Sequence, residues 1–266
     1  MTGVMLTVGI DEVGYGPKLG PLVVAAALAR KPLRARVRIA DSKKVFSQAT
    51  GVRTLEPAVL GFLGAGSFRE LLDRLGTPFP DAPWYRDALE LPLTEPLEGL
   101  EGARARFVDP AEFNASTRER NKSDFLFEIA ADLIRNIRGA HPEATRFVVG
   151  KHGGRHFYLR GIQERISPTV MVIEESPRRS AYSIPGATIE FLEGAEDRHE
   201  LVALASMMGK YVRECAMRLF NDFWSRHREG LRRTAGYGAD AARFFQEIEP
   251  ELRRLRMDRD AVLRLR

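Results

Sequence analysis

Two adjacent acids, Asp11 and Glu12, follow an apolar stretch and precede a bend that contains Gly14 and Gly16. Burying an uncompensated carboxylate is costly, so this acid pair indicates either a solvated turn or a site for a cation. Consecutive strand residues point to opposite faces, so both acids serve one site only if the strand ends beside them. Carboxylate oxygens favour hard cations such as Mg²⁺ and Mn²⁺. We expect a divalent metal site here, with a turn that carries two solvated acids as the alternative.

The composition is that of a folded protein outside membranes. The chain has 266 residues, of which 44% are hydrophobic and 29% are charged. Its apolar runs are too short for a membrane span, and its first residues lack the cationic and apolar regions of a secretory signal. One cysteine, Cys215, excludes an internal disulfide framework and a cysteine zinc site. We expect a cytoplasmic protein with no membrane partner.

The positive charge is concentrated towards the end of the sequence. The formal net charge is +5, and residues 211–266 contain 13 arginines against 9 acids. A basic balance of this kind is typical of proteins that bind polyanions such as nucleic acids. A helical tail with a solvated, mixed-charge face is the alternative.

The acids and the basic residues must be positioned by a core of strands and helices. Apolar runs predict strands before the glycine bend, over 22–28, within 31–45, and at 146–150, 170–174 and 188–192. Apolar periodicity predicts helices at 68–75 and 121–138, a long helix from an Asp197 N-cap to about Trp224, and two short arginine-rich helices after the loop 234–240. The irregular, proline-rich stretch 47–106 is expected to lie outside the core sheet. Strands interleaved with helices indicate a mixed-sheet α/β domain.

Five short motifs, in order between residues 8 and 245, resemble those of type 2 ribonucleases H, the ribonuclease HII and HIII group. The motifs are GIDEVGYGP (9–17) with GPLVVAA (20–26), DSKK (41–44), FVDP (107–110) before the helix that follows Asn121, ASMMGK (205–210) with Arg213-Glu214, and GYG (236–238). The resemblance implies a ribonuclease H-like mixed β-sheet flanked by helices, with a C-terminal helical extension. Residues 1–225 are then the catalytic domain, with 47–106 as a variable insertion, and residues 226–266 a helical segment that packs on it.

The resemblance also implies a reaction. Members of the family hydrolyse the RNA strand of RNA–DNA hybrids with two divalent ions, Mg²⁺ or Mn²⁺, held by four carboxylates. The catalytic metal ligands in this chain are then Asp11, Glu12 and Glu196, with Asp197 as the alternative to Glu196. For Glu196 and Asp197, acids that merely complement a helix dipole are the competing interpretation.

The third carboxylate of the family is missing. It stands at the end of the central strand, where this chain has Gly150, and no acid occurs between Glu143 and Glu164. Glycine has no side chain to bind a metal, so the two-ion site is one ligand short. Either the activity is reduced, or Asp109 or Asp124 reaches in, or the chain is a substituted copy of an active parent.

The glycine bend is the family's sensor of the ribose 2′-hydroxyl. The backbone amides of Gly14, Tyr15 and Gly16 can serve that role although Tyr15 replaces the more usual arginine. Tyr15 can stack on a sugar or base, or simply pack. Tyr237 resembles the tyrosine that stacks at the RNA–DNA junction, and its flanking glycines allow close approach of a substrate.

Four basic residues are expected to contact phosphates, which Lys and Arg recognise without regard to sequence. They are Lys43, Lys44, Lys210 and Arg155. The loop histidines His152 and His156 are candidate proton carriers near the metals.

The leading hypothesis is an RNA–DNA hybrid endoribonuclease with impaired activity. A non-catalytic relative that binds hybrid or other nucleic acid is the runner-up, and a metal-dependent DNA nuclease of the same fold is a third hypothesis. No protein partner is inferred from the sequence.

Overall fold

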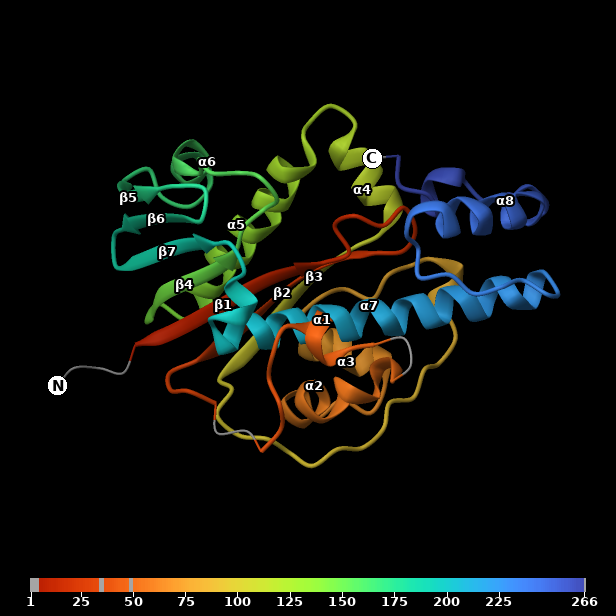
Figure 1. Ribbon diagram of the computed structural model, residues 1–266, viewed down its shortest axis with the longest axis horizontal. Coiled ribbons are helices and arrows are strands. Elements are labelled where there is room, and N and C mark those ends of the chain that lie inside the picture. The colour runs from red at the N-terminus through yellow and green to blue at the C-terminus, as the bar shows by residue number, and fades with distance from the viewer. Residues whose placement is uncertain (1–4, 34–35, 48–49, 266) are drawn as a thin grey trace.

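A computed structural model describes residues 5–33, 36–47 and 50–265, and it is built on a mixed seven-stranded sheet (Figure 1). The strand order is β3-β2-β1-β4-β7-β6-β5. The β1–β4 and β4–β7 pairs are parallel, and the other four pairs are antiparallel. The strands are β1 (Leu6–Val13), β2 (Leu22–Ala29), β3 (Gly102–Val108), β4 (Ala144–Gly150), β5 (Met171–Glu175), β6 (Arg179–Ile184) and β7 (Ala187–Leu192).

Helices cover both faces of this sheet (Figure 1). The helices are α1 (Ser42–Val45), α2 (Glu56–Leu63), α3 (Phe68–Arg74), α4 (Pro110–Thr117), α5 (Lys122–Ala140), α6 (Leu159–Arg165), α7 (Glu200–His227) and α8 (Gly238–Arg254). Two short 3-10 helices also matter for the site, η3 (Ala195–Asp197) and η4 (Arg259–Ala261).

The two faces form two separate hydrophobic cores. Because β2 is buried along its whole length, its alternate residues serve opposite faces. Val23 and Ala25 join the core beneath α7, whereas Leu22 and Val24 join the core beneath α5. Helix α7 approaches β1 closely at Gly9, where a Cβ would lie 2.3 Å from the carbonyl carbon of Leu201, so only glycine fits there.

The structure confirms the predicted strands before and after the glycine bend, those at β4, β5 and β7, and the helices α3, α5 and α7. Helix α8 packs on the α7 core through Phe244, whose ring lies 5.5 Å from that of Phe220. The second of the two predicted C-terminal helices is only the 3-10 turn η4. Among the described residues, no helix is long and apolar enough to cross a membrane.

Three local expectations were wrong. The predicted strand within 31–45 is absent from its described residues, and DSKK instead forms the short helix α1, capped by Asp41. The N-cap of α7 is His199 and not Asp197, because residues 195–197 form their own 3-10 turn before the helix. The last residues of the stretch 47–106 do enter the sheet, as the beginning of its edge strand β3.

Candidate metal and nucleic-acid site

The acid pair lies at the edge of the sheet where the parallel strands β1 and β4 both end. The carboxyl ends of parallel strands meet at one edge, which is where open α/β sheets bind their ligands. A cavity of about 400 Å³ opens there. Its lining brings together Asp11, Glu12, Gly14, Tyr15, Ser42, Lys43, Gly150, Glu193, Glu196, Ser206, Lys210 and Tyr237, among others.

Asp11 and Glu12 line this cavity and are half-buried. Burial, together with the charge of Glu196, raises the pKa of Asp11 to about 7 despite the lowering effect of a hydrogen bond from Ser206. Burial, followed by the charge of Asp11, also raises the pKa of Glu12 well above its usual range. These carboxylates therefore repel one another in a poorly solvated place, and a bound cation would relieve that repulsion.

Ser206 is a residue of the cavity that the sequence analysis did not single out. Its hydroxyl lies 3.0 Å from that of Ser42, and it also hydrogen-bonds the Asp11 carboxylate. Helices α7 and α1 thereby fix the orientation of Asp11. The available signal was a serine within the otherwise apolar stripe of a buried helix, at a position where a polar group needs a partner.

The structure distinguishes between the two candidate acids before α7. Glu196 lines the cavity, and its Oε1 lies 3.7 Å from Nζ of Lys43. Asp197 is instead paired with Lys44, at 2.5 Å, outside the cavity lining. The same pairing leaves Lys44 away from the acids, so of the two lysines only Lys43 lines the cavity.

Gly150 lies directly beside the acid pair. A Cβ at this position would lie 2.7 Å from Oδ1 of Asp11 and 3.7 Å from Oε2 of Glu12. The two acids proposed to replace the missing ligand lie elsewhere: Asp109 caps α4 through the amide of Glu112, and Asp124 pairs with Arg155 at 2.5 Å. Neither lines the cavity, so the expectation that one of them reaches in is not supported.

The donor set fits a divalent ion only in part. Asp11 and Glu12 offer half-buried, mutually repelling oxygen ligands of the kind that Mg²⁺ and Mn²⁺ prefer. However, no group of three or more His, Cys, Asp or Glu side chains in residues 5–33, 36–47 and 50–265 is arranged to hold a metal. These residues suit one weakly held ion and do not supply the ligands for two.

Phosphate-binding candidates lie on either side of the acids. Lys210 lines the cavity, pairs with Glu214 at 2.7 Å and lies over the ring of Phe46. Arg155 lines a neighbouring cavity of about 670 Å³, which shares Tyr15 with the first.

The glycine bend and the loop of Tyr237 form the wall opposite β4. Gly14 and Tyr15 line the cavity, whereas Gly16 is exposed and does not. Tyr15 packs against the ammonium group of Lys122, 4.7 Å from its ring centre, so packing accounts for part of its role. Tyr237 is 48% exposed and lines the cavity, which leaves its ring accessible for stacking.

His152 does not suit the role of a proton carrier. It is 2% exposed and packs among Phe127, Tyr158 and Phe191. Burial lowers its pKa to about 3, so the ring stays neutral at physiological pH. His156 lies 3.4 Å from the ammonium group of Lys151, outside the cavity of the acids.

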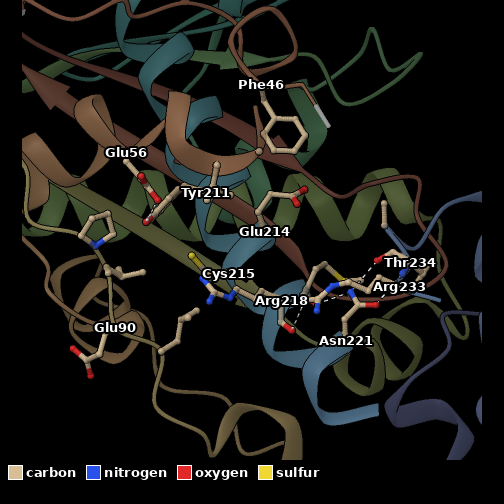
Figure 2. A pocket seen from close by; sticks show the side chains of 17 residues that line it. Phe46, Glu56, Glu90, Tyr211, Glu214, Cys215, Arg218, Asn221, Arg233 and Thr234 are labelled. Carbon is tan, nitrogen blue, oxygen red and sulfur yellow. Dashed lines mark hydrogen bonds between the residues drawn. The ribbon is translucent and has the colours of Figure 1, made fainter. Parts of the chain in front are cut away.

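A third cavity, of about 460 Å³, lies along α7 and has Glu214 in its lining (Figure 2). Glu56, Tyr211, Cys215 and Asn221 are among its lining residues (Figure 2). None of the site residues expected from the sequence lines it. Glu214, which pairs with Lys210, lines this cavity, whereas Lys210 lines the cavity of the acids.

Comparison with known proteins gives one sequence match and several structural ones. The family model for ribonuclease HII matches residues 8–58. A search of the curated proteins finds no match to the sequence.

The structural matches extend over nearly the whole chain. The ribonuclease HII in a PCNA:ribonuclease HII complex from Archaeoglobus fulgidus is 18% identical, with a TM-score of 0.52 over 98% of this chain and 95% of that one. A mutant form of Bst-RNase HIII is 18% identical, with a TM-score of 0.53 over 98% of this chain and 66% of that one. Bst-RNase HIII in complex with Mn²⁺ is 18% identical, with a TM-score of 0.50 over 99% of this chain and 67% of that one.

At this level of identity the structural matches show a shared fold, and the sequence match is confined to β1, β2 and the residues up to the beginning of α2. The chain is therefore similar in sequence to ribonuclease HII over residues 8–58, and over nearly its whole length it shares the fold of ribonucleases HII and HIII.

Proposed function

We propose that this protein binds RNA–DNA hybrids and hydrolyses the RNA strand slowly, in a reaction that requires Mg²⁺ or Mn²⁺. One observation carries the proposal: the end of β1 and the loops before α7 and α8 bring Asp11, Glu12, Glu196 and Tyr237 into one cavity. The same cavity contains Lys43 and Lys210, which suit a phosphate backbone. The similarity of residues 8–58 to ribonuclease HII suggests the reaction class.

Each part of the cavity has a role in this proposal. Asp11 and Glu12 would hold the metal, with Glu196 nearby; when bound, a divalent ion acts as a Lewis acid and lowers the pKa of water. Ser206 orients Asp11 for that purpose. Lys43 and Lys210 attract phosphates regardless of sequence.

The other wall of the cavity would read the substrate. The amides of Gly14 and Tyr15 face a sugar, and the exposed ring of Tyr237 stacks on a sugar or base. These contacts need no acid at position 150. Hybrid binding and hydrolysis therefore depend on different residues.

The second candidate function is hybrid binding without hydrolysis. Gly150 favours it, because the position beside Asp11 offers no ligand where the two-ion reaction needs one. In this case the acid pair serves at most one ion that is too weakly held to act.

A gel assay separates these functions. A labelled RNA–DNA hybrid and a DNA duplex of the same sequence are incubated with the protein in Mg²⁺, Mn²⁺, Ca²⁺ or EDTA, beside the Asp11→Asn variant. Slow cleavage of the hybrid in Mg²⁺ or Mn²⁺, lost in Asp11→Asn, supports the leading proposal. Binding with no cleavage supports the second. Cleavage of the DNA duplex but not of the hybrid contradicts both and indicates a DNA nuclease.

A further inference from the structure

Two buried arginines lie beneath the glycine bend and are not explained by catalysis. Arg213 comes from α7 and Arg264 from the segment 259–265 that follows α8, and each is 1% exposed. Neither forms an ion pair with a carboxylate among the described residues, and Nε and Nη2 of Arg264 have no hydrogen-bond partner there. A buried cation without a counter-ion is costly. An apolar side chain at either position would cost less free energy to bury. The acceptors of these two guanidinium groups therefore indicate what the arginines do.

Arg213 joins the glycine bend to the loop that precedes Tyr237. Its Nη1 donates to the carbonyl of Pro21 at 2.7 Å, and its Nη2 donates to the carbonyls of Leu19 at 3.2 Å and Ala235 at 3.0 Å. The first two carbonyls belong to the glycine bend, and the third lies two residues before Tyr237. One side chain therefore fixes both loops.

Arg264 holds the other end of the glycine bend. Its Nη1 donates to the carbonyl of Gly14 at 2.5 Å, and its own backbone amide donates to the carbonyl of Lys18 at 2.8 Å. The guanidinium group lies 4.6 Å from the ring centre of Phe113. The segment around Arg264 is held in turn by Asn114, which bonds the carbonyl of Leu263 at 2.8 Å and the amide of Leu265 at 2.9 Å.

The bond to Gly14 sets the direction of the next amide. No described peptide bond is cis, so the C=O of Gly14 and the N–H of Tyr15 point in opposite directions. Because the carbonyl of Gly14 accepts from Arg264 in the interior, the Tyr15 amide points away from Arg264, and Tyr15 is among the residues that line the cavity. Gly14 has a φ of 88°, and a Cβ there would lie 2.6 Å from the carbonyl oxygen of Pro21, so this turn has little freedom to adjust.

We propose that Arg264 is a positioning residue for substrate selection: it turns the Gly14–Tyr15 peptide so that the Tyr15 amide faces the sugar of the bound strand. The segment 259–265 is thereby part of the mechanism that distinguishes a hybrid from duplex DNA. This role rests on the proposed function, because it requires that a nucleic acid enter the cavity. The orientation of the peptide itself does not require it.

The first test needs no nucleic acid. Arg264→Met keeps the apolar contact with Phe113 but removes the donor to Gly14, and Arg259→Met removes an exposed arginine from the same segment as a matched control. Hydrogen exchange of peptides that cover 14–21 should become at least about tenfold faster in Arg264→Met only, while β4 exchanges as before. Unchanged exchange over 14–21 in a folded Arg264→Met variant would overturn the proposal, whether or not the protein binds a hybrid.

The second test measures selectivity. In Ca²⁺, which allows binding without cleavage, Arg264→Met should lose about tenfold in hybrid affinity and less than about twofold in affinity for duplex DNA. Equal losses for both, or a loss matched by Arg259→Met, would overturn the proposal. Arg264→Lys, which keeps the charge but not the planar donor geometry, is measured alongside and should show the same selective loss, so the test stands if Arg264→Met does not fold. A parent protein that binds neither nucleic acid contradicts the proposed function, while the exchange experiment still decides the orientation.

Discussion

The two walls of the cavity differ in how completely they are built. On the β4 side, Gly150 lies against Asp11 and offers no side chain to a metal, and Glu196 lies near Lys43. On the opposite side, buried arginines hold three backbone carbonyls of the glycine bend and one of the loop before Tyr237. The wall that contains Gly150 and Glu196, here called the metal-facing wall, is short of metal ligands. The wall formed by the glycine bend and the loop of Tyr237, the substrate-facing wall, is held by hydrogen bonds from both arginines.

This difference separates binding from chemistry. Ligand loss at one position weakens the hold on a metal but leaves untouched the amides, Tyr237 and the lysines that would contact a nucleic acid. A protein of this kind should bind its substrate far better than it cleaves it. Four predictions test the contrast, beginning with the largest expected effect.

Restoring an acid on the metal-facing wall should have the largest effect. Gly150→Asp places a carboxylate beside Asp11, and we expect single-turnover cleavage of a hybrid in Mg²⁺ to rise by about a hundredfold or more, because a second ion can then be held. The φ of Gly150 is not in the left-handed region, so the cost is a shift of the Asp11 carboxylate.

The matched control for this variant is Gly154→Asp, since a Cβ at Gly154 would meet nothing within 4 Å. The affinity of Gly150→Asp for the hybrid in Ca²⁺ should stay within about twofold of that of the parent. A Gly150→Asp variant with a normal melting curve and unchanged cleavage would show that this position is not the missing ligand.

Neutralising Asp11 should remove the residual cleavage and stabilise the fold. The pKa of Asp11 is raised to about 7, so its ionised form opposes folding, and that cost grows as the pH rises from about 4 to about 7. At pH 8 we expect Asp11→Asn to be more stable by about 1–3 kcal/mol, or several degrees in Tm. Below about pH 4 this gain in stability should vanish, because the Asp11 carboxyl of the parent is then protonated in both the folded and the unfolded state.

Asp81→Asn is the control for that experiment, because the Asp81 side chain is fully exposed. Thermal melts of both variants at pH 4 and pH 8 provide the measurement. A loss of stability in Asp11→Asn at pH 8 would contradict the idea that the ionised acid pair lowers the stability of the folded protein.

On the substrate-facing wall, Tyr237→Ala should weaken hybrid binding by about tenfold, the loss of one stacking contact. Phe157→Ala is the control, since Phe157 is 70% exposed and lies outside the cavity. Fluorescence anisotropy in Ca²⁺ measures both. Equal affinities for the two variants would remove Tyr237 from the binding surface.

The two neighbouring lysines should have different effects on salt dependence. Hybrid affinity should fall with salt at a slope near −0.9 per phosphate contact, and Lys43→Ala should reduce that slope by about 1, with a few-fold loss of affinity. Lys44→Ala should change neither, because Lys44 is paired with Asp197 outside the cavity. An affinity independent of salt would contradict the electrostatic account as a whole.

Local patterns in the sequence predicted much of this structure. The apolar runs of β1, β2 and α7 are long enough to be unambiguous, and the acids at the end of β1 stand out against them. Strand β6 (RSAYSI) was missed because half of its residues are polar, and strand β3 was missed because a proline-rich segment precedes it.

The supporting contacts of the site could not be predicted in this way. Arg264 contacts Gly14 across 250 residues, and Ser42 contacts Ser206 across 164. No periodicity or spacing encodes such contacts, because they exist only once the sheet has formed. The sequence likewise left Glu196 and Asp197 as alternatives, which only their different partners, Lys43 and Lys44, distinguish.

The most direct test of the contrast between the two walls is a titration of the parent and of Gly150→Asp with Mn²⁺. Calorimetry and the paramagnetic resonance of free Mn²⁺ both measure how many ions bind. Because Gly150 leaves the site one ligand short, we predict a single weakly bound ion in the parent and two in the variant, at equal hybrid affinity. Two tightly bound ions in the parent would contradict the account, as would an identical titration of the two proteins.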